Sequence, residues 1–108
     1  MLFRSFGYPP FKHLARVVVA SKEYERTALY ADIFGDELRK IAGGSRVVDI
    51  LGPAPAPLER LRGQWRRHLV FKADKVGPIS ALLQKGLKRV HFPSDVGVEV
   101  DVDPLNMM

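Results

Sequence analysis

Twice along the sequence, a segment with the composition or spacing of a strand is followed by a segment with the apolar spacing of a helix. This pattern restricts the fold more than any other feature. The β-branched run at Val17–Val19 predicts a strand from about Leu14 to Ala20. Apolar residues at spacings of three and four then predict a helix from about Lys22 to Ala42. We expect Ser21 to cap the start of this helix and Gly43–Gly44 to end it.

A proline-rich segment follows the next strand. We expect that strand from about Arg46 to Leu51, and we expect it to end at Gly52–Pro53, because proline has no amide hydrogen for a strand ladder. The segment Pro53–Pro57 then predicts a stiff loop. A short helical turn is expected over Leu58–Arg62, and Gly63 breaks it.

The second half of the chain repeats the alternation. A third strand is predicted from about Gln64 to Ala73, with Trp65 on the same face as Leu69. Gly77–Pro78 opens a second helix. The apolar stripe of that helix consists of Ile79, Leu82, Leu83, Leu87 and Val90. The last strand, about Val96 to Asp103, alternates, so Val96, Val98, Val100 and Val102 are expected to face inward and Gly97, Glu99, Asp101 and Asp103 outward.

The resulting order of strand, helix, strand, strand, helix, strand predicts an α+β fold. Each helix can make a right-handed crossover onto one face of an antiparallel sheet. The expected architecture is a ferredoxin-like two-layer sandwich (βαββαβ) with four strands, in which the first and third are central and the fourth pairs with the first. At 108 residues the chain fits one domain. We expect that domain to cover residues 13–108, after an interdomain lead-in segment at 1–12 that contains Gly7 and Pro9–Pro10.

Composition argues against several classes of site. The chain has no cysteine, so it has no disulfide, thiol nucleophile or cysteine-bound zinc. Its three histidines lack metal-ligand spacing, and no glycine-rich phosphate-binding loop is present. Its apolar runs are far shorter than the roughly 20 residues that span a bilayer. We therefore expect a cytoplasmic domain with no catalytic residue, no metal and no cofactor of its own.

Positive charge is concentrated in one third of the chain. The net charge is +5, and residues 57–89 hold nine Lys/Arg against two acids. Such residues can neutralise the phosphates of nucleic acid, and Trp65 can either stack on an unpaired base or pack at the edge of the sheet. The candidate DNA- or partner-binding residues are Arg60, Arg62, Trp65, Arg66, Arg67, Lys72, Lys75, Lys85, Lys88 and Arg89.

The acids of the last strand qualify this prediction. Glu99, Asp101 and Asp103 share one strand face and could form a cation or acid–base site. We favour cross-strand pairing of these acids with Arg16 and Arg66 on the open face of the sheet. Arginines held in this way are less available to phosphate, so the proline-rich loop and its arginines are expected to meet a partner before the middle of the third strand does.

Three motifs, in order, carry a resemblance to a known family. They are Phe6–Phe11 (FGYPPF), Leu51–Leu58 (LGPAPAPL) with Arg62–Gly63, and Val100–Pro104 (VDVDP). Together they resemble the C-terminal domain of primosomal protein N′, the PriA family of bacterial replication-restart DNA helicases. The resemblance covers essentially the whole chain.

The resemblance implies that the chain is one domain of a larger ATP-dependent 3′–5′ DNA helicase, whose ATP and zinc sites lie elsewhere. It also implies a fold similar to a small-subunit ribosomal protein. Such a domain helps to bind forked or single-stranded DNA and to position the motor at stalled forks, in the bacterial cytoplasm at the nucleoid. The alternative is a protein-interaction module that docks the tail of the single-stranded DNA-binding protein, or the helicase core of the same polypeptide.

Overall fold

The computed structural model describes residues 13–44 and 47–102, so the predicted lead-in segment at 1–12 lies outside the described residues. Two helices and four strands occupy these ranges. In chain order they are β1 (His13–Ser21), α1 (Tyr24–Ala42), β2 (Asp49–Leu61), β3 (Gln64–Ala73), α2 (Val76–Arg89) and β4 (Gly97–Val102).

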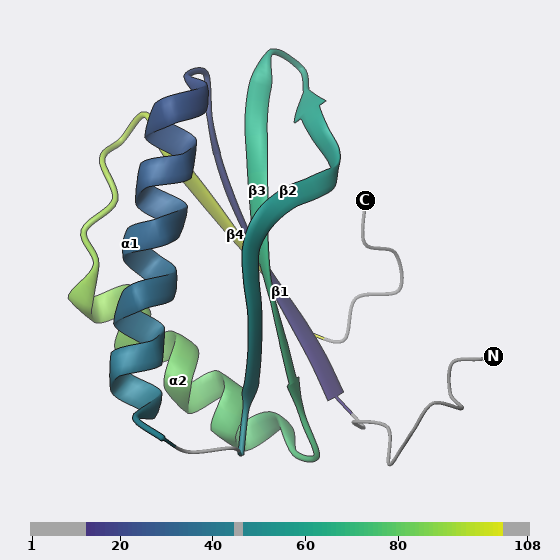
Figure 1. The fold of residues 1–108 in the computed structure, drawn as a ribbon, viewed down its shortest axis with the longest axis vertical. Coiled ribbons are helices and arrows are strands. Elements are labelled where there is room, and N and C mark those ends of the chain that lie inside the picture. The colour runs from purple at the N-terminus through teal and green to yellow at the C-terminus, as the bar shows by residue number, and fades with distance from the viewer. Residues whose placement is uncertain (1–12, 45–46, 103–108) are drawn as a thin grey trace, which may run out of the picture.

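The four strands form one antiparallel sheet in the order β2-β3-β1-β4. Both helices lie against the same face of this sheet (Figure 1). Val17 of β1 pairs with Leu69 of β3 on one side and with Val100 of β4 on the other. The predicted ferredoxin-like α+β sandwich and its strand order are confirmed.

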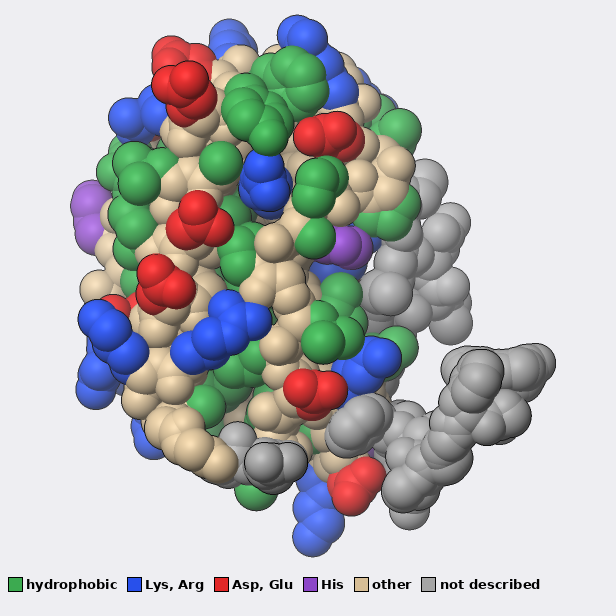
Figure 2. Space-filling view, viewed as in Figure 1, with side chains coloured by type: hydrophobic (Ala, Val, Ile, Leu, Met, Phe, Trp, Pro, Cys, Tyr) green, Lys and Arg blue, Asp and Glu red, His purple; other side chains and the backbone are tan. Residues whose placement is uncertain are grey.

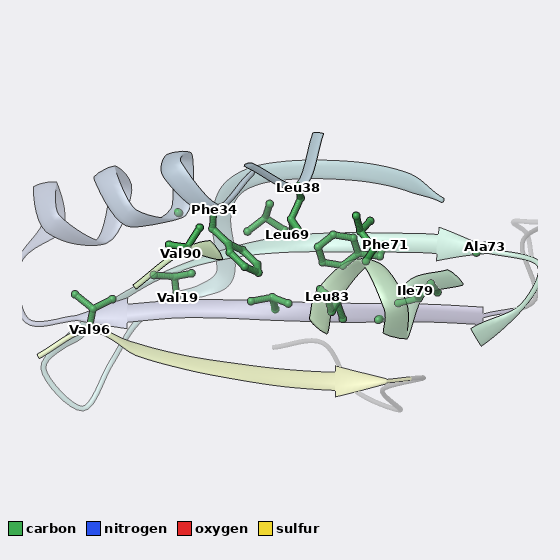
Figure 3. Packing of buried hydrophobic residues seen from close by; sticks show 14 residues of the cluster. Val19, Phe34, Leu38, Leu69, Phe71, Ala73, Ile79, Leu83, Val90 and Val96 are labelled. Atoms are coloured by element: carbon green, nitrogen blue, oxygen red, sulfur yellow. The ribbon is translucent and has the colours of Figure 1, made fainter. Parts of the chain in front are cut away.

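The core fills the space between the helices and the sheet. Phe34 and Leu38 project from α1 toward Leu69 and Phe71 of β3, and Ile79 and its neighbours approach from α2 (Figure 3). All five of these side chains have no solvent exposure. The periodicity of the two helices and the alternation of β3 account for this layer, because each places one apolar face toward the other.

The start of α1 differs from the prediction. The helix begins at Tyr24 with Glu23 at the N-cap position, and no side chain caps it. Ser21 is the last residue of β1, where it pairs with Trp65 of β3. Its hydroxyl donates to the Glu23 carbonyl oxygen (2.9 Å) and lies 2.6 Å from the hydroxyl of Thr27. The predicted Ser21 cap is wrong because the strand runs farther than expected, whereas the predicted end of α1 at Gly43 (φ 61°) is confirmed.

Strand β2 also differs, because it continues through the prolines to Leu61. The predicted loop at 53–57 and the helical turn at 58–62 are wrong. β2 is an edge strand, so only one of its sides needs amide donors. Its register with β3 shifts between Leu51 and Ala54 and again between Pro55 and Arg60. These irregularities leave Pro53 and Pro57 outside the register, whereas Pro55 stays paired with Arg67, and the strand remains intact.

Three residues of α2 and β4 that were predicted to face the core are exposed. Leu87 of α2 is 40% exposed, and Gly86 faces α1 in its place. Val100 and Val102 are 40% and 44% exposed, because β4 lies at the edge of the sheet away from the helices. Val98, nearer the start of that strand, packs against the core as predicted.

Gly86 is the point of closest approach between the helices, and its replacement tests this packing. A Cβ at Gly86 would lie 3.2 Å from Cε1 of Phe34 and closer still to Cδ2 of Leu38. We expect Gly86→Ala to lower the free energy of unfolding by about 1–3 kcal/mol, because the added methyl overpacks a filled core. Urea denaturation followed by circular dichroism measures the change.

The matched control lies in the same helix. A Cβ at Gly77 would meet nothing within 4 Å. Gly77→Ala is therefore expected to leave stability unchanged or to raise it by up to about 1 kcal/mol through helix propensity. An equal loss at both positions would contradict the proposed tight contact.

Candidate nucleic-acid interface

The ten residues predicted to bind a partner fall into three regions of the structure. Arg60, Arg62, Trp65, Arg66 and Arg67 belong to the hairpin formed by β2 and β3. This hairpin turns beside the start of α1, at the top of Figure 1. The second region, at the far end of β3, contains Lys72 and Lys75, and the third lies on α2 and contains Lys85, Lys88 and Arg89.

The hairpin turns over two residues. Leu61 pairs with Gln64, and between them Arg62 (φ 54°) and Gly63 (φ 78°) both have positive φ. This is the backbone of a type I′ turn, which favours Asn, Asp or Gly at both positions. A left-handed conformation costs an arginine roughly 1–2 kcal/mol. Arg62 therefore lowers the stability of the turn, and it places a guanidinium at the tip of the hairpin.

Behind the tip, two adjacent aromatic rings lie between two arginine side chains. The guanidinium carbon of Arg60 lies over the Trp65 ring, 4.8 Å from its centroid. The Trp65 ring meets the Tyr24 ring edge-on at 5.4 Å. Arg67 lies 5.3 Å from the centroid of Tyr24 and donates from Nη2 to the tyrosine hydroxyl (2.7 Å). We call these four residues, Arg60, Trp65, Tyr24 and Arg67, the hairpin ladder.

Tyr24 is the member of this ladder that the sequence did not predict. It recurs with Ala28 and Ala31 at helical spacing, which predicts a place on the apolar stripe of α1, yet it is 45% exposed. It reaches Trp65 because β1 ends opposite that residue and α1 starts three residues later. The hydroxyl of Thr27 also contacts the Trp65 carbonyl oxygen (3.5 Å), so the first turn of α1 is fixed against β3. The sequence signal that could have identified Tyr24 is its position, because it is an aromatic residue in the first helical turn after the end of a strand.

Hydrophobic and basic side chains adjoin on the surface above α1 and the hairpin (Figure 2). Arg26, two residues after Tyr24 on α1, is already paired, because it forms a bidentate bond with Asp95 at 2.7 and 2.9 Å. The hydrogen bond from Arg26 lowers the pKa of the Asp95 carboxyl. This exposed pair therefore adds no net charge to the surface near the ladder.

Two further side chains of the hairpin, Arg66 and His68, lie on the open face of the sheet, which the helices do not cover. Arg66 is 8% exposed and donates from Nη1 to the Leu58 carbonyl oxygen (2.8 Å). His68 beside it is half-buried. Burial lowers the pKa of His68, and the charges of Arg16 and Arg66 lower it further. His68 is thus neutral at pH 7 and contributes no positive charge.

The acids of β4 lie on this face in the predicted register. Asp101 pairs with Arg16, and Glu99 shares a depression of about 230 Å³ with Arg62 and Arg66. Arg66, however, is bonded to the backbone of β2 instead of to an acid. Its predicted pairing with the acidic row is therefore not what holds it in place, and Asp103 lies outside the described residues.

The remaining basic residues are dispersed. Lys72 stands opposite Asp49 in the sheet, and Arg89 contacts Glu37 at 3.4 Å. Lys85 lines an apolar pocket of about 190 Å³ between the two helices. The structure therefore does not join these residues, or the exposed Lys75 and Lys88, to the hairpin in one patch.

Within residues 13–44 and 47–102, no three His, Asp or Glu side chains gather in a way that could hold a metal ion. Neither of the two helices in that part of the chain has the length and apolar character of a membrane span.

One solved structure has a similar fold. It is "De novo designed protein Foldit4", which matches with a TM-score of 0.62, covers 87% of this chain and 98% of its own, and shares 14% sequence identity. At that identity the likeness concerns the fold alone.

Sequence relatives are more specific. A family model described as "Primosomal protein N C-terminal domain" matches residues 4–105. Replication restart protein PriA of Bacillus subtilis is 32% identical over 97% of this chain, and that of Thermotoga maritima is 28% identical over 89%. The chain spans only 13% and 12% of the length of these two relatives. The chain belongs to the family of C-terminal domains of primosomal protein N, found in the replication restart protein PriA.

Proposed function

We propose that this domain is an accessory DNA-binding domain that helps to position a replication-restart helicase on forked or single-stranded DNA. The observation that carries the proposal is the β2–β3 hairpin, which presents Arg60, Arg62 and Arg67 together with Trp65. Among residues 13–44 and 47–102, no carboxylate forms an ion pair with these three arginines. Their charge is therefore available to phosphate groups.

The wider context of the proposal comes from the family. We infer that the longer protein is an ATP-dependent 3′–5′ DNA helicase that acts in the bacterial cytoplasm at the nucleoid. Its ATP and zinc belong to other parts of that protein. The residues of this domain do not fit a zinc site, since the chain has no cysteine and its described residues form no metal-binding cluster.

Charge reversal at the hairpin tip tests the DNA-binding function. We expect Arg62→Glu to weaken the binding of labelled forked and single-stranded DNA, because glutamate cannot neutralise a phosphate. Each phosphate that is no longer neutralised lowers the slope of log K against log salt by about one unit. Fluorescence anisotropy at about 50 and 200 mM salt measures both the affinity and the slope.

The control makes the same change in charge at Lys40, an exposed residue in the last turn of α1, far from the hairpin. Lys40→Glu is expected to weaken binding less and to keep the salt slope. Equal losses of DNA affinity in the two variants would show that binding depends only on the net charge of the domain, and this result would refute a site at the hairpin.

The turn conformation generates a separate prediction about stability. Arg62→Asn places a residue that tolerates positive φ at a position where arginine is disfavoured. We expect the free energy of unfolding to rise by about 0.5–1 kcal/mol while DNA affinity falls. Thermal denaturation and anisotropy on the same preparation measure the two effects. A variant that gained stability and kept full affinity would show that Arg62 has no binding role.

A second candidate function is docking of a protein segment. The pocket between α1 and α2 is lined by apolar residues such as Ile41, Val48 and Leu82, with Lys85 among them. An apolar side chain beside a carboxylate would match this lining. The acidic, apolar-ended tail of the single-stranded DNA-binding protein has that chemistry, and the helicase core of the same polypeptide is the other candidate.

Titration of the domain with the tail peptide, followed by amide NMR, tests the docking function. We expect shifts confined to the pocket, a loss of affinity in Lys85→Glu, and unchanged peptide affinity in Arg62→Glu, because the hairpin is remote from the pocket. Shifts that centre on the hairpin and compete with DNA would place both partners on one site and contradict a separate docking pocket.

A further inference from the structure

We propose that the hairpin ladder is a stacking platform for an unpaired base of single-stranded DNA, with the guanidinium of Arg60 as its outer surface. The proposal rests on the DNA-binding function above and names what the hairpin recognises. The phosphate contacts of that function need only positive charge. Base stacking needs a flat, oriented surface as well.

The first argument is the position of Arg60. It stands directly opposite Trp65 in the sheet register, so the two side chains emerge on the same face. Its guanidinium lies over the indole at 4.8 Å, although the residue as a whole is exposed. The cation therefore covers the indole and is itself open to solvent, where a base can reach it. Arginine planes in this setting stack on bases in single-stranded nucleic acids.

The second argument is that the platform is held in place before any ligand arrives. Trp65 is half-buried, and its ring is fixed edge-on against Tyr24 at 5.4 Å. Tyr24 in turn accepts a hydrogen bond from Arg67 at its hydroxyl (2.7 Å). These side chains are thus already ordered in the folded domain, so they lose less conformational entropy when DNA binds.

The third argument is the arrangement of charge around the flat surface. Arg62 at the tip and Arg67 at the inner end of the ladder lie on either side of the Arg60–Trp65 pair along the hairpin. A strand of DNA alternates bases with phosphates, and a stack flanked by cations matches that alternation. Stacking is tolerant of sequence because every base has a π-face. We therefore infer a site without strong base preference.

A purely structural role is the competing explanation. In that case the ladder only fastens the hairpin to α1, and bases contribute nothing to binding. The two roles differ in one measurable quantity, which is the ratio of affinities for an oligonucleotide with bases and for an abasic oligonucleotide of the same length. Both ligands carry the same phosphates.

Trp65 is the only tryptophan of the chain, so its fluorescence reports on this site alone. The experiment titrates the 108-residue chain with oligothymidine and with the abasic oligonucleotide at fixed salt. We expect oligothymidine to quench or shift the fluorescence and to bind about 5- to 100-fold more tightly than the abasic strand. The abasic strand should change the emission little.

Substitutions locate the effect. Arg60→Lys keeps the charge but loses the planar group, and we expect it to bring the ratio of affinities close to one. Lys40→Ala, which removes a charge far from the ladder, is expected to keep the wild-type ratio. Circular dichroism confirms that both variants fold. A wild-type ratio in Arg60→Lys would overturn the role of the guanidinium plane.

The outcomes separate this inference from the function on which it rests. Equal, salt-dependent binding of both oligonucleotides by the wild-type chain would overturn base stacking and leave the DNA-binding function intact. Binding of neither oligonucleotide at low salt would overturn both. Preferential binding of oligothymidine that Arg60→Lys abolishes would support both.

Discussion

The pairing of β1 on both of its sides determines the position of every other element. β1 is bonded to β3 and to β4, and its residues Ala15, Val17 and Val19 have no solvent exposure. Because β1 and β3 occupy the centre, β2 is left at an edge of the sheet. An edge strand can lack amide donors on one side, and so β2 accommodates its prolines. The long β2–β3 hairpin, with its arginines and tryptophan, exists because of this placement.

Patterns among residues that are close in the sequence were sufficient to predict most of the helices and strands. The bounds of β3 and the end of α1 at Gly43 were predicted from alternation and from a helix stop signal, both of which depend on neighbouring residues. The errors concern contacts between distant segments. Proline excludes a residue from a central strand but not from an edge strand, and the sequence of β2 does not say which it is. Gly86 replaces Leu87 at the interface between the helices for a similar reason, since the close approach of Leu38 and Phe34 requires the smaller residue.

The candidate site was predictable only in part. The concentration of arginine was visible, because the hairpin brings together residues that are close in sequence. Tyr24 was missed as a partner of Trp65, since they lie far apart in the sequence and only the pairing of Ser21 with Trp65 makes them neighbours. The sequence left two roles open for Trp65, in the core or on a base. The structure places its half-buried ring between Arg60 and Tyr24, a position compatible with a stacking surface but different from the core layer around Leu69.

A designed protein adopts a similar fold with 14% sequence identity, so very different sequences can form this architecture. Residues of the hairpin that add little to stability are the ones for which a functional reason is needed. Arginine at a left-handed turn position is disfavoured by about 1–2 kcal/mol. The cation–π contact of Arg60 with the half-buried Trp65 adds only about 0.5–1 kcal/mol to stability at an exposed site. Stability alone thus does not account for Arg62 and gives only a weak reason for Arg60, whereas the proposed contact with a strand of alternating phosphates and bases would account for both.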